Sequence, residues 1–211
     1  MTSEPVFDEA FCEQLTELFR WRRDVRRFRT DPLPDGLIEA LIDRAALSPS
    51  VGLSEPWRWV LVDDPARRAM VRASYEACNA EALACQADDR AGLYARLKLS
   101  GLDDAPCHLA VFVEADPDQG HGLGRRTMPE TTAYSAVIAI HTLWLAARAM
   151  GIGVGWVSIL DAEAVSTALD VPADWKLVGY LCVGYPAAAD DTPELERHDW
   201  EHRRAPRIMR L

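Results

Sequence analysis

The sequence lacks the cysteine pattern of a disulfide scaffold or a zinc site. Its five cysteines are an odd number, are widely spaced and include no Cys-x-x-Cys pair, so neither framework is expected. Cys78 and Cys85 would share a helix face but lie about 10 Å apart, too far for a disulfide bond. We therefore expect buried, reduced thiols, as in a cytoplasmic protein.

The chain also lacks an excess of positive charge, because 33 acidic residues outnumber 23 lysines and arginines and give a net charge of −10. This argues against nonspecific nucleic-acid binding, whose signature is a basic surface, and against binding to anionic membranes. Residues 1–5 have neither a basic flank nor an apolar core, so no secretory signal is expected. The most apolar segment, 133–150, contains His141 and Arg148, which favours a buried helix over a membrane span.

Two common site patterns are missing or incomplete. No Gly-x-Gly-x-x-Gly follows an expected strand, so a Rossmann nicotinamide site is unsupported. His198 and His202 are four residues apart and could share a helix face as metal ligands, but the spacing places no third ligand. We expect no metal site.

What the sequence does contain is the pattern of one α+β domain covering residues 1–211. The length of 211 residues and the 49% hydrophobic content fit one globular domain, and no repeat or linker divides it. Periodicity predicts helices at 8–20, 35–46 (capped by Asp35), 65–90, 131–150 and 161–169, and strands at 57–62, 107–113, 151–159 and 176–183. Such an alternation predicts a sheet packed against helices.

Two of these helices have unusual faces. The stretch 65–90 is polar and alanine-rich, so we expect it to face solvent. The helix at 131–150 is apolar nearly all round, and such a helix must be covered on every side. Either a central position in the core or a dimer interface would supply that cover.

Arg22-Arg23-Asp24-Val25-Arg26, directly after the first helix, is the most informative stretch. Guanidinium groups suit bidentate phosphate recognition and stay charged at any working pH. The carboxylate opposes phosphate binding, so it needs a separate role. A solvated charged turn explains the five residues equally well. Much further along, the glycine-rich run 153–158 ends in a hydroxyl, which suggests a site that holds a phosphorylated cofactor and moves a proton beside it.

Three motifs together resemble the flavin-dependent nitroreductase superfamily. They are the arginine motif, Ser48-Pro49-Ser50-Val51-Gly52 followed by Glu55-Pro56-Trp57, and the run 143–148 leading into 151–159. The similarity covers nearly the whole chain, including residues 94–99 and the strand ending at Gly184. Many members carry serine where this chain has Asp24. That aspartate, with Ser158, resembles a subgroup that makes 5,6-dimethylbenzimidazole, the lower ligand of vitamin B12.

The resemblance implies a homodimeric α/β/α sandwich with a central, mostly antiparallel sheet and FMN at the dimer interface. It also implies that reduced FMN is a substrate, which O2 helps to break into dimethylbenzimidazole and erythrose 4-phosphate. A separate flavin reductase would supply the reduced FMN. The alternatives are an NAD(P)H-dependent nitroreductase or flavin reductase that keeps its FMN, and a flavin-binding protein without catalysis.

The resemblance also implies phosphate-binding residues. Arg22 and Arg26 match positions that hold the FMN phosphate or the reduced pyrimidine ring, and Arg203 matches a second phosphate position. Arg23 and Val25 would contribute through backbone contacts. A flexible basic tail is the structural alternative for Arg203.

Asp24 and Ser158 are the expected catalytic residues. Fragmentation requires protons to leave the ribityl chain and ring, and a nearby carboxylate is a suitable general base. Its pKa reflects arginines that lower it and burial that raises it, and the sequence does not say which dominates. Ser158 can bond a flavin nitrogen and relay a proton. A salt-bridged structural aspartate and a core serine are the alternatives.

The remaining expected flavin contacts come mainly from loops. Ser50 and Gly52 match the loop that meets the flavin, where glycine allows close backbone approach; a simple helix-ending turn is the alternative. Gly155, with Gly153, would let backbone donors approach the pyrimidine carbonyls. Glu55 replaces the glutamine usual in relatives, and the loop 124–133 is a residue shorter. We also expect residues 84–92 to form a lid that excludes water.

Overall fold

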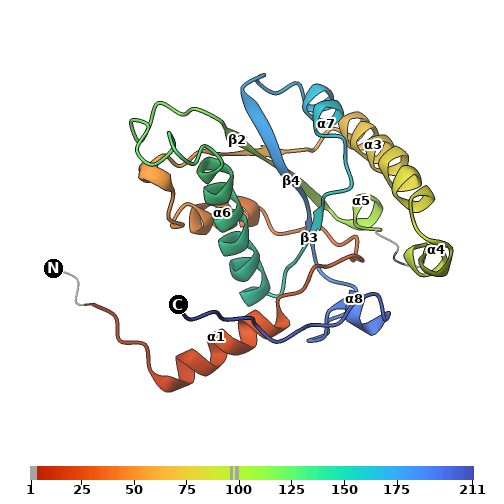
Figure 1. Cartoon of the computed structure of the whole chain (residues 1–211), viewed down its shortest axis with the longest axis horizontal. Helices are drawn as coiled ribbons and strands as arrows, with labels where there is room; N and C mark the ends of the chain where they lie inside the picture. The colour runs from red at the N-terminus through yellow and green to blue at the C-terminus, as the bar shows by residue number, and fades with distance from the viewer. Residues whose placement is uncertain (1–3, 96, 98–99) are drawn as a thin grey trace.

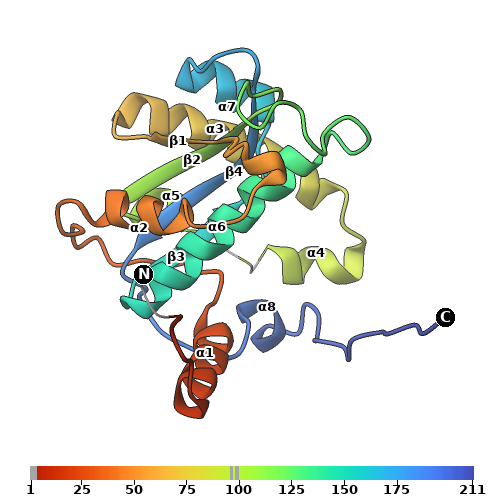
Figure 2. The ribbon, with the colours of Figure 1, turned by 90° about the vertical axis from the view of Figure 1, so that its left-hand side faces the viewer.

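In the computed structural model, which describes residues 4–95, 97 and 100–211, a four-stranded sheet lies between two layers of helices (Figures 1 and 2). Arg96, Lys98 and Leu99, part of the stretch quoted for the resemblance, lie outside the described residues. The strands are β1 (Trp57–Leu61), β2 (Cys107–Glu114), β3 (Gly153–Val157) and β4 (Trp175–Gly184). Their order is β1-β2-β4-β3 and every neighbouring pair is antiparallel.

The helices are short except for α3 and α6. They are α1 (Glu9–Trp21), α2 (Leu37–Ala45), α3 (Pro65–Ala84), α4 (Asp88–Tyr94), α5 (Gly101–Asp104), α6 (Thr131–Ala149), α7 (Ala162–Leu169) and α8 (Glu194–Arg197), with a 3₁₀ turn η1 (Val51–Leu53). Figure 2 shows α2 and α6 on one side of the sheet and α3 and α7 on the other.

The central strands are apolar on both faces, and this requires helices on both sides. On β2, Leu109 and Val111 pack into the cluster that includes α2 and α6. The intervening Ala110 and Phe112 pack into the opposite cluster, with Val71 of α3. Successive strand residues point to opposite faces, so one strand supplies both cores. The expected α+β sandwich with an antiparallel sheet is confirmed.

Some expected boundaries were wrong. The cap of α2 is Gly36, in the left-handed region at φ 74°, and no side chain caps the helix; Asp35 is therefore not the cap. The stretch 65–90 is divided between α3 and α4, and it is not wholly solvent-facing because Val71 is fully buried. Neither α5 nor α8 was expected, since helices of four residues leave little periodic signal.

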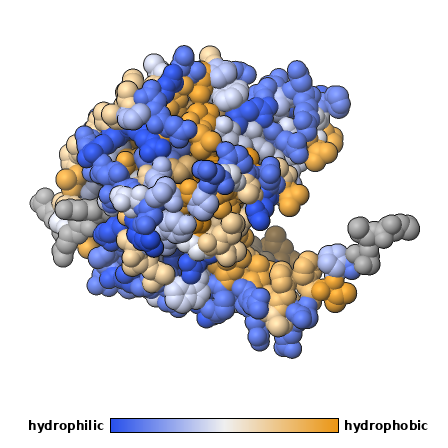
Figure 3. Space-filling model, turned by 180° about the vertical axis from the view of Figure 1, so that it is seen from behind, coloured by the Kyte–Doolittle hydropathy of each residue, from blue (hydrophilic) through white to orange (hydrophobic). Residues whose placement is uncertain are grey.

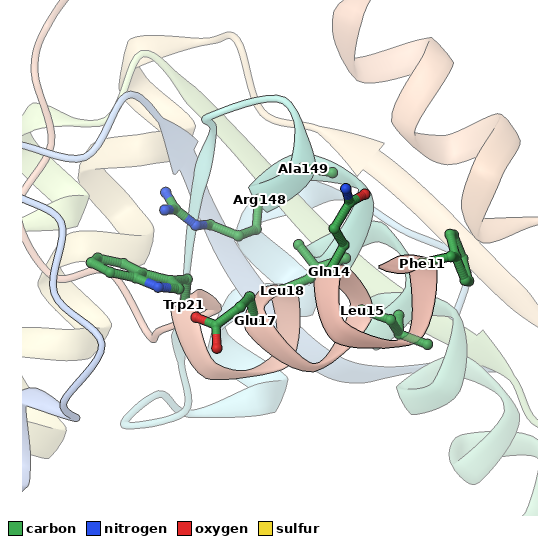
Figure 4. Close-up of a pocket in the computed structure, with 8 residues that line it drawn as sticks. All are labelled: Phe11, Gln14, Leu15, Glu17, Leu18, Trp21, Arg148 and Ala149. Carbon is green, nitrogen blue, oxygen red and sulfur yellow. The ribbon is translucent and has the colours of Figure 1, made fainter. Parts of the chain in front are cut away.

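The chain does not cover α6 on every side. Ile140 and Leu143 are fully buried, but Tyr134, Val137 and Ile138 remain 52%, 40% and 43% exposed. Helix α1 has no buried residue at all. An open groove of about 490 Å³ lies between α1 and the end of α6, lined by Phe11, Gln14, Leu15, Glu17, Leu18, Trp21, Arg148 and Ala149 (Figure 4).

Apolar surface also extends toward the N-terminal segment, which projects from the body of the molecule (Figure 3). Val6 and Phe7 are 93% and 62% exposed. Together with α1 and α6, this segment offers more apolar surface than scattered single residues would.

The cysteines are unpaired, but the expectation that all are buried was wrong. Cys107 and Cys182 are buried in the sheet, Cys78 is half-buried, and Cys12 and Cys85 are exposed. In the part of the chain that the structure describes, no helix combines the length and apolar character needed to cross a bilayer.

Candidate active site

The segment after α1 runs along the edge strand β3, and this fixes the arginine motif. Asp24 and Val154 form a parallel β-bridge, and the Val25 amide donates to the Val154 carbonyl at 3.0 Å. The Trp156 amide donates to Asp24 Oδ1 at 2.9 Å. The Asp24 carboxylate is therefore oriented by a backbone donor of the strand beneath it.

Two glycines of β3 make this close approach possible. A Cβ at Gly155 would lie 2.1 Å from the Val25 carbonyl oxygen, and one at Gly153 would lie 2.8 Å from Val25 Cγ2. Such distances are far inside van der Waals contact, so only glycine fits. The packing of the arginine segment thus gives a structural reason for both glycines.

Two adjoining cavities meet at Asp24. The first, the arginine cavity, has a volume of about 160 Å³ and is lined by Arg22, Arg23, Asp24, Arg26, Pro193, Glu194, Leu195 and Arg203. The second, the aromatic cavity, has a volume of about 260 Å³ and is lined by Asp24, Arg26, Tyr75, Asn79, Tyr94, Leu97, Trp156, Val157, Ser158, Ile159, Leu195 and Trp200. Asp24, Arg26 and Leu195 belong to both linings, so a long ligand with a charged end would pass Asp24.

The arginine cavity gathers cations whose charges are incompletely compensated. Burial lowers the pKa of Arg22, and the nearby Arg203 lowers it further. Burial, Arg203 and Arg22 likewise lower the pKa of Arg23, whose Nε donates to the Asp191 carbonyl at 2.9 Å. Arg22 stacks on the Trp144 ring at 5.1 Å. A phosphate dianion would relieve this mutual repulsion and accept several charge-assisted hydrogen bonds, so the residues fit the phosphate end of FMN.

Burial dominates the electrostatics of Asp24, which the sequence left open. Its pKa is raised by burial, against the lowering effects of the Trp156 amide, Arg26 and Arg22. Arg26 Nε lies 3.8 Å from Asp24 Oδ2, too long for a strong ion pair, and 42% of the Asp24 side chain is open. Asp24 also contributes to the lining of both cavities. A carboxylate with a raised pKa is a stronger base than an ordinary aspartate.

Ser158 lies one residue beyond β3 and lines the aromatic cavity with Asp24. Its hydroxyl has no hydrogen-bond partner among the residues that the structure describes, and the residue is exposed. This disfavours a core serine bonded to backbone. The free hydroxyl can both donate and accept.

Ser50 and Gly52 are not brought to these cavities within one chain. Ser50 Oγ accepts from the Glu55 amide at 3.0 Å. Gly52 adopts φ 59°, and a Cβ there would meet the Leu123 carbonyl oxygen at 2.9 Å. Next to them, the Val51 amide bonds Ser135 near the start of α6, whereas Trp144 near its end bonds the Arg23 carbonyl. Nine residues separate these two contacts on α6, about 13 Å along the helix axis.

Glu55, the departure from relatives, also lies on this loop. It adopts φ 43°, and its Oε2 accepts from Gln119 Nε2 at 3.3 Å. It lines neither cavity.

Sequence reasoning missed the residues that complete the aromatic cavity. Tyr75 and Asn79 are four apart on α3 and so share a face, a signal hidden by treating 65–90 as solvent-facing.

Glu194, on the unexpected α8, lies 3.2 Å from Arg27 Nη1. His198 and His202 each lie near a different acid: His198 is 3.7 Å from Glu194 and His202 is 3.6 Å from Glu196. The described residues contain no group of three or more side chains able to hold a metal ion.

Comparison with known proteins agrees with this geometry. The Nitroreductase family matches residues 19–185. The chain is 55% identical over 210 residues to the 5,6-dimethylbenzimidazole synthase of Rhodospirillum rubrum, with 100% of both chains covered. It is 50% identical over 195 residues to a 5,6-dimethylbenzimidazole synthase of Rhodobacter capsulatus, with 92% of this chain and 94% of the relative covered.

Solved structures show the same fold. Iodotyrosine deiodinase bound to FMN and 3-iodo-L-tyrosine superposes with a TM-score of 0.72 at 22% identity, covering 93% of this chain and 97% of that one. A BluB-like flavoprotein from Clostridium difficile gives 0.64 at 18% identity, covering 93% and 94%. The sequence match over residues 19–185 and the full-length relatives lead to one conclusion: this chain belongs to the nitroreductase family.

Proposed function

We propose that this chain catalyses the oxygen-dependent fragmentation of reduced FMN to 5,6-dimethylbenzimidazole and erythrose 4-phosphate, with the atoms of the pyrimidine ring released as a third fragment. The observation that carries the proposal is Asp24, a carboxylate with a raised pKa that lines both the arginine cavity and the aromatic cavity. Relatives 55% and 50% identical carry the name of that synthase. A reductase that only passes electrons has no need of a base beside the sugar-like arm.

In this proposal each residue has one task. Reduced FMN, when bound, supplies the electrons that O2 accepts and is itself the molecule broken down. Arg22, Arg23 and Arg203 hold its phosphate by charge-assisted hydrogen bonds. Asp24 lies between the two cavities, where it can accept a proton from the ribityl arm.

Ser158 and the remaining contacts orient the ring. The free Ser158 hydroxyl bonds a ring nitrogen and passes a proton on. Val25 and Gly155 fix the backbone beneath the arm, because the Val25 carbonyl occupies the space that a side chain at position 155 would need. Arg26 lines both cavities, and its guanidinium group, 3.8 Å from Asp24 Oδ2, favours the ionised form of the base.

The proposal includes a homodimer. Ser50 and Gly52 lie outside both cavities of their own chain, so a second copy would bring this loop to the flavin. The exposed apolar residues of α6 (Tyr134, Val137 and Ile138) and the exposed apolar side chains of α1 form a surface that such a dimer would cover. Ile138→Glu should therefore give monomers that bind FMN weakly, whereas Met70→Glu, at a more exposed residue of α3, should remain dimeric. Light scattering and FMN titration measure both, and a dimeric Ile138→Glu protein contradicts this arrangement.

The reaction is placed in the cytoplasm, where a separate flavin reductase supplies the reduced FMN and where unpaired cysteines stay reduced. No nucleic acid or membrane takes part.

Aerobic incubation with chemically reduced FMN tests the function directly. Mass analysis should find dimethylbenzimidazole and erythrose 4-phosphate in amounts that match the flavin lost. Steady oxidation of NAD(P)H with all FMN recovered intact would overturn the proposal in favour of a nitroreductase or flavin reductase.

A further inference from the structure

Asn79 and Tyr94, two polar residues that line the aromatic cavity, have no role in the reaction proposed above. Asn79, the only asparagine of the chain, lies on α3 four residues after Tyr75, and both line the cavity. The Tyr94 hydroxyl, from α4, donates to Asn79 Oδ1 at 2.9 Å. Two helices thus meet at one amide on the cavity wall.

This bond leaves the donors of the amide unused. An asparagine amide has one acceptor oxygen and an NH2 group with two donors. With Oδ1 bonded to Tyr94, the Nδ2 group has no acceptor among residues 4–95, 97 and 100–211. A half-buried donor pair on a cavity wall is suited to an acceptor on a ligand.

Packing holds Tyr94 in place. Its ring lies 6.0 Å from that of Trp200, and Arg90 lies over the Trp200 ring at 5.3 Å. Burial raises the pKa of Tyr94, so its hydroxyl keeps its proton. The Asn79 amide is therefore oriented by a packed neighbour on the same cavity wall, and its NH2 group is left for a ligand.

We propose that Asn79 is a binding residue for the ring system of the ligand, donating to a carbonyl oxygen or ring nitrogen, and that Tyr94 is the positioning residue that orients it. The identity of that ring as reduced or oxidised flavin rests on the proposed function. The guanidinium groups of the arginine cavity serve the phosphate, and Asp24 lies between the cavities. Uncharged N–H donors suit the neutral acceptors of a heteroaromatic ring, which lies beyond Asp24.

The test compares two ligands that differ in the ring. FMN has the ring, arm and phosphate, whereas ribitol 5-phosphate has only the arm and phosphate. Asn79→Ala should weaken FMN binding roughly three- to ten-fold, the value of one or two neutral hydrogen bonds, and leave ribitol 5-phosphate binding unchanged. Arg22→Ala should weaken binding of both ligands.

Two further variants separate recognition from structure. Asn79→Asp keeps the shape and the bond from Tyr94 but replaces the donors by an acceptor, so FMN binding should fall more than ten-fold. Tyr94→Phe keeps the ring packing on Trp200 and frees the amide, so FMN binding should fall roughly two- to four-fold. Gln86→Ala is the control. Gln86 lies just past the end of α3, its side-chain amide donates to the Ala82 carbonyl, and it does not line the cavity.

Calorimetric titration of the full-length protein under air-free conditions gives these affinities without turnover. Equal FMN affinity of wild type, Asn79→Ala and Asn79→Asp overturns the inference, as does an equal loss for both ligands. Dimethylbenzimidazole formation is measured separately on the wild type. If the wild type forms no dimethylbenzimidazole but Asn79→Ala still weakens binding of FMN and not of ribitol 5-phosphate, the proposed function is refuted. The assignment of Asn79 as a ring-binding residue then stands.

Discussion

Replacing Asp24 by asparagine is the sharpest perturbation of the proposed mechanism. The side chain keeps its size, and its oxygen can still accept the bond from the Trp156 amide, 2.9 Å away in the native protein. Only the negative charge and the ability to accept a proton are lost. The fold and the cavities should therefore survive while the base disappears.

The expected loss of rate follows from the general base. Proton transfer by a positioned side chain contributes roughly 10²–10⁴-fold to a rate, which corresponds to about 3–5 kcal/mol of barrier. FMN binding should be unchanged or tighter, because the neutral amide of the Asp24→Asn variant no longer repels the phosphate from a position between Arg22 and Arg26. Product formation and binding thus move in different directions, which unfolding cannot imitate.

The pH dependence provides a second signature. Only the ionised carboxylate accepts a proton, so wild-type kcat/KM should fall as the pH drops through a pKa above the ordinary aspartate value. A pKa that is higher in the folded state means that ionisation opposes folding, and stability declines as the pH rises through it. Asp24→Asn should remove the acidic limb of the rate profile and raise the Tm of the FMN-free protein at pH 7.

Stopped-flow mixing of reduced FMN with O2, followed by quantification of dimethylbenzimidazole, measures the rate. A variant that retains more than a tenth of wild-type product formation with FMN bound would refute the role of Asp24 as base. Asp43→Asn is a suitable control, because Asp43 is exposed on α2 and lines neither cavity.

Other predictions test separate parts of the structure. Arg203→Ala should weaken FMN binding roughly 10- to 150-fold, the value of one charge-assisted hydrogen bond, as a titration would show; unchanged affinity would make Arg203 a free tail. Ser158→Ala should lower the rate of dimethylbenzimidazole formation more than FMN affinity, and a rate equal to wild type would remove the proton relay. His108 bonds the buried Tyr180 hydroxyl at 2.9 Å, and burial lowers the pKa of His108 to about 4, so the contribution of His108 to the free energy of unfolding should fall by roughly 2–3 kcal/mol between pH 6.5 and pH 4. Urea titrations of wild type and His108→Phe check this, and equal pH slopes would contradict it. Leu143→Ala, at a fully buried residue of α6, should cost about 2–5 kcal/mol in the same titration; a loss below about 1 kcal/mol would show that the site is not packed as described.

The fold was predictable from the sequence where the pattern is periodic. The β2 run is apolar at nearly every position from 107 to 113, which fits a strand buried on both faces, and α6 carries an apolar pattern nearly all round. The prediction that Asp35 caps α2 was wrong because Gly36, in the left-handed region, is the N-cap residue instead. The four-residue helices α5 and α8 have too few residues to show a period.

The site residues were predictable where they belong to short sequence motifs. The charged residues of the arginine motif and Ser158 line adjoining cavities, as the motifs suggested, whereas Val25 lines neither. Asn79, Tyr94 and Trp200 come from three parts of the chain that only tertiary structure brings together, so no local pattern marks them. Nor does any local pattern indicate that Val25 fills the space above Gly155, or that the loop at 50–52 lies outside the cavities of its own chain.

A crystal structure of the Asp24→Asn variant with FMN tests the central claim most directly. The variant should trap the flavin intact, with the phosphate among the arginines and the side chain at position 24 within about 2.6–3.2 Å of the ribityl arm, the reach of a general base. If the arm instead runs along another wall, with that side chain beyond hydrogen-bonding distance of every flavin atom, Asp24 is not the base and the proposed fragmentation is wrong.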